Sequence, residues 1–197
     1  MADALYLSLW FPSFDEAEIL PRTLSVLRQI PFSPTRSGIA YSAIHPVSWS
    51  EPTIFERRYG PGVLPEEAVA EVVEFLHRDY AYVFETYWDL WTPLEGMEKW
   101  TLTPSLLRLI AQGMEFEDRD AEQTGRIQID FGLDTCFLHE QVELTAEAER
   151  NVRSNVQKLV EFTARVEKNA EATGRLLWSE SEENLAQKLI ARLQRVQ

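Results

Sequence analysis

The chain has 197 residues, of which 45% are hydrophobic and 26% are charged, and its formal net charge at pH 7 is −13. This composition is that of a folded protein and excludes a disordered chain. The single cysteine, Cys136, excludes an intramolecular disulfide and a zinc site built on cysteines. No signal peptide and no uncharged stretch of ~20 residues is evident, so the sequence predicts a cytoplasmic protein without membrane contact.

The negative charge is concentrated in the middle of the sequence. Residues 65–144 contain eighteen acidic and five basic residues, whereas residues 1–64 carry a net charge of −1 and residues 145–197 carry +1. A segment of this kind repels nucleic acid and attracts basic proteins. We therefore expect no nucleic-acid partner, and the acidic segment is either a solubilising surface or a docking site for a basic protein.

The first elements of the chain are a strand and a helix. Leucine or phenylalanine occupies every second position of residues 4–11, which predicts a strand with one buried face. The helix begins either at a capping box formed by Ser13 and Glu16 or at Pro21, because proline inside a helix removes a hydrogen bond. The sequence leaves both starts open.

Three further strands and a second helix are predicted in the first half of the chain. Strands are predicted at 38–44, 53–59 and 80–91, and a helix at 65–76 with proline in its first turn. The resulting order, strand-helix-strand-strand-helix-strand, is that of ferredoxin-like folds, in which two helices cover an antiparallel sheet. Residues 1–92 are therefore predicted to be the ferredoxin-like half of an α+β protein.

The second half is predicted to begin after Gly96 and to span residues 97–197. Two strands at about 106–117 and 125–138 form a hairpin around the polar loop 118–124. The remainder is helical: a long helix, and a shorter one at the C-terminal end. The two halves form either separate domains or one fused domain.

The long helix is predicted to begin at Thr145, whose hydroxyl suits an N-cap. Its apolar stripe and that of the last helix follow the helical period. The predicted buried positions are Val152, Val156, Leu159, Thr163 and Val166 in the long helix, and Leu185, Leu189, Leu193 and Val196 in the last one.

The outer face of the hairpin is the predicted binding surface. Pairing residue 117 with residue 126 places apolar residues opposite one another on one face. The other face then carries Glu115, Asp130 and Asp134 around a shallow trough of small residues, Ala111, Gly113 and Gly132. A solvated sheet face, or one covered by a helix, is the alternative interpretation.

The aromatic strand at 80–91 supplies two further candidate binding residues. Strand alternation places Tyr87 and Trp91 on the side opposite Tyr82, Phe84 and Trp88. Their rings either join the two halves of the protein or line a ligand site.

No residue pattern predicts a metal, a cofactor or a catalytic group. Asp130 and Asp134 are four residues apart on a strand, so their Cα atoms lie ~13 Å apart, too far for one metal ion. His45, His77 and His139 lack the spacing of a metalloprotease motif. Neither a serine nucleophile elbow nor a phosphate-binding glycine loop occurs.

Two functional hypotheses follow. The first is a non-enzymatic interaction protein (an inhibitor, an immunity-type protein or an adaptor) that presents Glu115, Asp130 and Asp134 to a basic protein. The second is a small-molecule binding protein or enzyme with a site between the two halves, lined by Tyr87 and Trp91 and by Asp130 or Asp134. A homodimer that associates through sheet surfaces is a third possibility.

Overall fold

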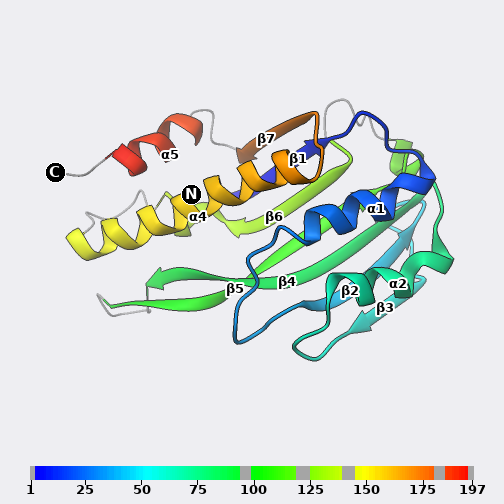
Figure 1. The fold of residues 1–197 in the computed structure, drawn as a ribbon, viewed down its shortest axis with the longest axis horizontal. Coiled ribbons are helices and arrows are strands. Elements are labelled where there is room, and N and C mark those ends of the chain that lie inside the picture. Colours follow the sequence, from blue (N-terminus) through cyan, green and yellow to red (C-terminus); the bar gives the residue numbers. More distant parts are fainter. Residues whose placement is uncertain (1–2, 94–98, 119–124, 139–144, 180–184, 195–197) are drawn as a thin grey trace.

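A computed structural model of the protein describes residues 3–93, 99–118, 125–138, 145–179 and 185–194. It is an α+β structure in which helices cover one face of a single antiparallel sheet (Figure 1). The predicted α+β class is thus confirmed. Within the described residues, no helix is both long and apolar enough to cross a membrane.

The sheet has seven strands in the order β3-β2-β4-β5-β6-β1-β7, and each neighbouring pair is antiparallel. Its strands are β1 (Ala4–Trp10), β2 (Ile39–Pro46), β3 (Phe55–Arg58), β4 (Tyr80–Pro93), β5 (Trp100–Gln112), β6 (Ile127–Leu133) and β7 (Gly174–Ser179).

The first four strands and two helices follow one another as predicted, but the strands do not form one four-stranded unit. In space β5 and β6 separate β1 from β4, so strands of both predicted halves pair in the same sheet. A contiguous ferredoxin-like half is therefore not formed. The reason is that β1 satisfies its two edges with β6 and β7, which come from the second half of the chain.

The described α-helices are α1 (Glu16–Leu27), α2 (Pro65–Val72), α4 (Ala146–Asn169) and α5 (Leu185–Gln194). Helix α1 begins after Asp15 and includes Pro21. The proline removes the hydrogen bond that its nitrogen would make to the Ala17 carbonyl, and its ring crowds that carbonyl. Helix α4 begins as predicted, with the Thr145 hydroxyl accepting a hydrogen bond from the Ala148 amide at 3.2 Å.

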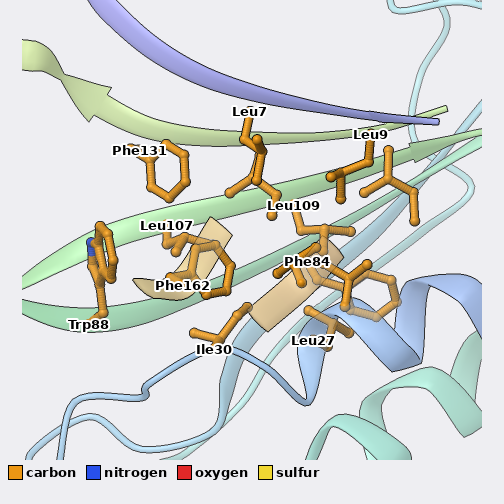
Figure 2. Close-up of a cluster of buried hydrophobic side chains, with 14 of the residues drawn as sticks. Leu7, Leu9, Leu27, Ile30, Phe84, Trp88, Leu107, Leu109, Phe131 and Phe162 are labelled. Atoms are coloured by element: carbon orange, nitrogen blue, oxygen red, sulfur yellow. The ribbon is translucent and has the colours of Figure 1, made fainter. Parts of the chain in front are cut away.

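The core lies between the sheet and the helices, and both predicted halves contribute to it. Figure 2 shows Trp88 of β4, Leu107 of β5 and Phe162 of α4 gathered in this layer. The Trp88 ring lies 5.3 Å from Phe131, 6.2 Å from Phe137 and 6.0 Å from Phe162, between ring centroids. Such aromatic clusters bury large apolar areas and dominate core energetics.

The predicted register of the hairpin is wrong. Ala111 lies opposite Ile127, and not opposite Gly132 five residues further on. Because side chains alternate between the two faces of a strand, a shift by an odd number of residues exchanges the faces of β5 relative to the prediction. Leu107, Leu109 and Ala111 therefore face the core, whereas Leu106 is 39% exposed.

The turn that follows β5 explains this register. At Gly113 the chain passes so close to another segment that an added Cβ would lie 2.2 Å from the Arg78 carbonyl oxygen. Glu117 then adopts a φ of 56°, which a strand cannot contain. Strand β5 consequently ends at Gln112 and extends in the other direction, back to Trp100.

Strand β7 is not among the predicted elements, because its apolar run is too short to show a period. The expected boundary at Gly96, the loop 119–124, His139 and Val196 of the last predicted helix lie outside the described residues.

The edge of β4 that β2 does not reach is closed by other groups. Beyond Thr86, the Ser33 amide donates to the Tyr87 carbonyl at 2.7 Å, and Lys158 Nζ donates to the Asp89 carbonyl at 2.6 Å. Asn155 of α4 accepts from the Trp91 amide and donates to the Trp91 carbonyl. These contacts replace a strand neighbour, so the long β4 needs no further strand there.

Candidate functional site

The sheet face opposite α1, α2 and α4, which we call the open face, carries the candidate site. Strand pairing aligns one residue from each strand in a single row across this face. From β3 to β7 the row reads Arg58, Tyr41, Glu85, Arg108, Asp130, Tyr6 and Trp178.

Charges in the row alternate, and they are largely compensated. Arg108 donates from Nε and Nη2 to one carboxylate oxygen of Glu85, at 2.9 and 2.7 Å. Asp130 lies on the other side of Arg108 in the register and accepts a hydrogen bond from the Gly132 amide at 2.7 Å. Opposite charges on adjacent strands stabilise the sheet. The open face is therefore not an anionic surface at its centre.

Two other arginines of this face stack on tyrosine rings. The Arg58 guanidinium lies 5.2 Å from the Tyr41 ring centroid, and the Arg36 guanidinium lies 4.6 Å from that of Tyr87. Stacking of this kind orients a guanidinium and leaves its N–H groups available at the edge. In the described part of the chain, neither arginine has a carboxylate within ion-pair distance.

The two stacked arginines border one hollow of about 270 Å³, which we call the arginine hollow. Tyr41, Glu85 and Tyr87 project into it from β2 and β4. Its rim comes from two loops, 36–38 before β2 and 59–61 after β3. The bridge between Gly38 and Val63 and the bond from the Gly62 amide to the Ser37 carbonyl hold these loops together.

A second hollow of about 520 Å³ adjoins it, and we call it the aromatic hollow. Val83 of β4 and Ile110 of β5, which are paired in the register, form its apolar floor. His45 and Trp49 form a wall, with ring centroids 4.8 Å apart at 60°. Both hollows share Tyr41, Arg58 and Glu85, so they are parts of one continuous groove.

The wall of the aromatic hollow is held by the turn that ends β5. The Trp49 amide donates to Glu117 Oε1 at 3.0 Å, and the Glu117 amide donates to the Val47 carbonyl at 2.9 Å. The Trp49 ring also meets the buried Phe116 ring edge-on, at 5.0 Å. The left-handed backbone of Glu117 thus serves to bring this carboxylate under the loop that carries Trp49.

Burial shifts the pKa values of two residues in the groove. It lowers the pKa of His45 below its usual value, against the opposing charge of Glu56, so the imidazole is neutral at pH 7. It raises the pKa of Tyr41, and a hydrogen bond to Glu56 and the charges of Glu56 and Glu85 add to the effect. The Tyr41 phenol therefore remains a neutral hydrogen-bonding group.

The groove is cationic, although the protein is acidic. The residues that line the two hollows include three arginines, Arg36, Arg58 and Arg108, and one carboxylate, Glu85. This gives the lining a formal charge of +2, or +1 with Glu56, which is hydrogen-bonded to Tyr41, while the whole chain carries −13. Local positive charge inside a negative protein marks a place suited to an anionic ligand.

The structure separates the predicted binding residues. Tyr87 lines the arginine hollow, and Asp130 lies in the cross-strand row. Glu115 lies in the turn after β5 and pairs with Arg78 at 3.1 Å, while Asp134 lies in a 3₁₀ turn and is 7% exposed. Trp91 lies on β4 away from both hollows. The acidic trough expected from Glu115, Asp130 and Asp134 is therefore not formed, because it depended on the incorrect register.

Sequence reasoning missed Arg36, Tyr41, Arg58 and Arg108. Each comes from a different segment, and only the strand register brings them together. One usable signal was the alternation in β4, which places Glu85 on the same side as Tyr87. Among the described residues, no group of three or more His, Cys, Asp or Glu side chains could hold a metal ion.

No family model matches the chain, and no match was found among curated proteins or solved structures.

Proposed function

We propose that the protein binds a small anionic molecule on its open face, with the anion held between Arg36 and Arg58. A guanidinium group offers a fork of N–H donors that matches a carboxylate or a phosphate. Two such groups, each oriented by a tyrosine ring, border the same hollow.

The observation that carries this proposal is that Arg36 and Arg58 form no ion pair with a described residue, although the protein is acidic. The chain has 32 acidic residues, and many of its arginines have found carboxylate partners. Among the described residues, arginines with an ion-pair partner include Arg22, Arg28, Arg57, Arg78, Arg108 and Arg175. Arg36 and Arg58 are held over tyrosines instead, which keeps their charge available to a ligand.

This proposal develops the second hypothesis from the sequence, that of a small-molecule site lined by aromatic residues. The groove takes Tyr87 from the first half of the chain and Arg108 and Ile110 from the second. The positions of Glu115, Asp130 and Asp134 do not support an acidic sheet face that receives a basic protein. A basic partner for the acidic segment at 65–144 remains a prediction that rests on charge alone.

The test is a titration with inorganic phosphate at low ionic strength, followed through the NMR signals of the arginine Nε–H groups. We expect the signals of Arg36 and Arg58 to shift, and Arg36→Gln or Arg58→Gln to raise the Kd about tenfold each. Losing one charge-assisted hydrogen bond costs about 1.5–3 kcal/mol, and 1.4 kcal/mol corresponds to a factor of ten.

A matched control is Arg150→Gln, which removes the same charge from an exposed position on α4. This variant should bind phosphate as the unmodified protein does. If all three substitutions weaken binding equally, phosphate responds only to overall charge and the proposal is wrong. If no arginine signal shifts, the groove is not an anion site.

A further inference from the structure

The aromatic hollow has an apolar surface that a small anion bound in the arginine hollow would not contact. Its floor consists of Val83, which is 5% exposed, and Ile110, which is partly exposed. Both lie on neighbouring antiparallel strands and face the same side, so together they form a flat apolar surface.

The side of the hollow is aromatic and rigidly supported. The Trp49 ring is fixed by the Phe116 ring beneath it and by the hydrogen bond from its own amide to Glu117. His45 meets Trp49 edge-on and is neutral, since burial lowers its pKa. A ring on the floor can therefore pack against aromatic edges without desolvating a charge.

The opposite side of the hollow is formed by the ion pair between Arg108 and Glu85. This pair uses Nε and Nη2 of Arg108, and in the described part of the chain its remaining N–H groups on Nη1 and Nη2 form no ion pair, which leaves them for a ligand. The guanidinium also offers a planar face to an aromatic ring. A ring in the hollow would thus lie between aromatic edges and a guanidinium.

The distance between the two hollows sets the length of a ligand that fills both. On β4 the arginine hollow takes Glu85 and Tyr87, and the aromatic hollow takes Val83 and Glu85. Their centres are thus displaced by two residues, or about 7 Å along the strand. The second hollow also extends one strand further, to β5, which adds about 5 Å across the sheet and gives roughly 8 Å in all.

We infer that the ligand is an aryl-alkyl acid, in which an aromatic ring is joined through a spacer to a carboxylate or phosphate. This inference rests on the proposed function, since the anionic group occupies the arginine hollow. With C–C bonds of ~1.5 Å, a spacer of about three to four atoms places the ring over Val83 and Ile110. The ring then packs beside Trp49 and next to the Arg108 guanidinium.

The experiment is a calorimetric comparison of acids that differ in spacer length. The probes are benzoate, 3-phenylpropanoate and 5-phenylpentanoate, with pentanoate as the ligand that lacks a ring. We expect 5-phenylpentanoate to bind at least tenfold more tightly than benzoate or pentanoate. A phosphate arm, 3-phenylpropyl phosphate against inorganic phosphate, shows which of the two anions the arginines prefer.

Two variants separate this inference from the proposal on which it rests. Ile110→Gln makes the floor polar at a position whose neighbour in the same row is already Gln128. It should remove the gain from the ring while leaving the Kd for inorganic phosphate within about twofold, because that contact is made elsewhere. Arg36→Gln should weaken every anion in the series.

The outcomes are distinguishable. Affinity that does not depend on the spacer, or a ring effect that survives Ile110→Gln, would overturn the aryl-alkyl inference and leave the anion site intact. The same holds if pentanoate binds as tightly as 5-phenylpentanoate. Binding of none of these carboxylates or phosphates would overturn both proposals. A ring effect that disappears in Ile110→Gln, with phosphate binding retained, supports the inference.

Discussion

The two faces of the sheet are made by alternating residues of the same strands, yet they are organised by different interactions. In β4, Trp88 and Leu90 on the covered face are at most 1% exposed. On the open face of the same strand, Glu85 pairs with Arg108, and Tyr87 supports Arg36. The covered face is therefore held by burial, and the open face by contacts between specific neighbours.

The two faces therefore depend on different features of the sequence. A buried residue needs only to be apolar and of the right size, and its position follows from the strand period. A residue of the open face acts only through the residue that lies beside it on the next strand. The row from Arg58 to Trp178 exists because seven strands are in one register.

The largest effect is expected when the covered face is broken at its aromatic centre. Trp88→Ala should lower the free energy of unfolding by about 3–5 kcal/mol, because it leaves a cavity beside Phe131 and Phe162. Tyr87→Ala, the adjacent residue on the open face, should cost about 1 kcal/mol or less. Urea unfolding of both variants measures the contrast.

A further variant tests whether Trp88 acts through its volume alone. In the described residues, its indole nitrogen is buried and has no hydrogen-bond partner. Trp88→Phe should therefore retain most of the stability that Trp88→Ala loses. Similar losses in Trp88→Ala and Tyr87→Ala would mean that the two faces do not differ as described.

An intermediate effect is expected at the edge where the covered face closes β4. Asn155 accepts from the Trp91 amide at 2.9 Å and donates to the carbonyls of Trp91 and Cys136, both at 2.8 Å. Asn155→Ala should lower the free energy of unfolding by about 2–3 kcal/mol, because it leaves three partly buried backbone groups without their partner. Urea unfolding provides the measurement here too.

The control for this prediction lies in the same helix. Asn169 is exposed, and within the described residues its side chain bonds to Gln29 alone, at 2.8 Å, so Asn169→Ala should cost less than about 0.5 kcal/mol. Equal costs at the two asparagines would show that the edge of β4 does not depend on Asn155.

Sequence reasoning predicts the covered face well and the open face poorly, because strand alternation identifies buried residues but does not identify neighbouring strands. The alternation of Leu5, Leu7 and Leu9 identifies a buried strand face, and all three are 0% exposed. The predicted stripe of α4 is buried as well, from Val152 to Val166. Neither pattern says which strand lies next to which, so the pairing of β1 with β6 and β7 could not be predicted.

The candidate site depends on which strands are neighbours and on their register. Tyr87 was placed on the correct side of β4 by alternation alone. The arginines were not found, because Arg36 comes from a loop and Arg58 and Arg108 come from strands 50 residues apart in the sequence. The close approach of Gly113 to Arg78, which set the register of β5, leaves no signature beyond a glycine.

The smallest predicted effect concerns His45, a half-buried residue in the wall of the aromatic hollow. Burial lowers the pKa of His45, so in the folded protein the neutral imidazole persists to lower pH than it does in the unfolded chain. As the pH falls below the ordinary histidine pKa of about 6.5, the unfolded state takes up a proton that the folded state does not. His45 therefore makes the fold less stable as the pH falls.

His45→Phe keeps a ring beside Trp49 and removes the titrating group. Urea unfolding between pH 7.5 and 5.5 should show the unmodified protein losing stability relative to this variant as the pH is lowered. A constant difference across that range would mean that the imidazole protonates as easily in the fold as outside it. The wall that His45 forms with Trp49 would then be hydrated, and it would not give the aromatic hollow a neutral aromatic side.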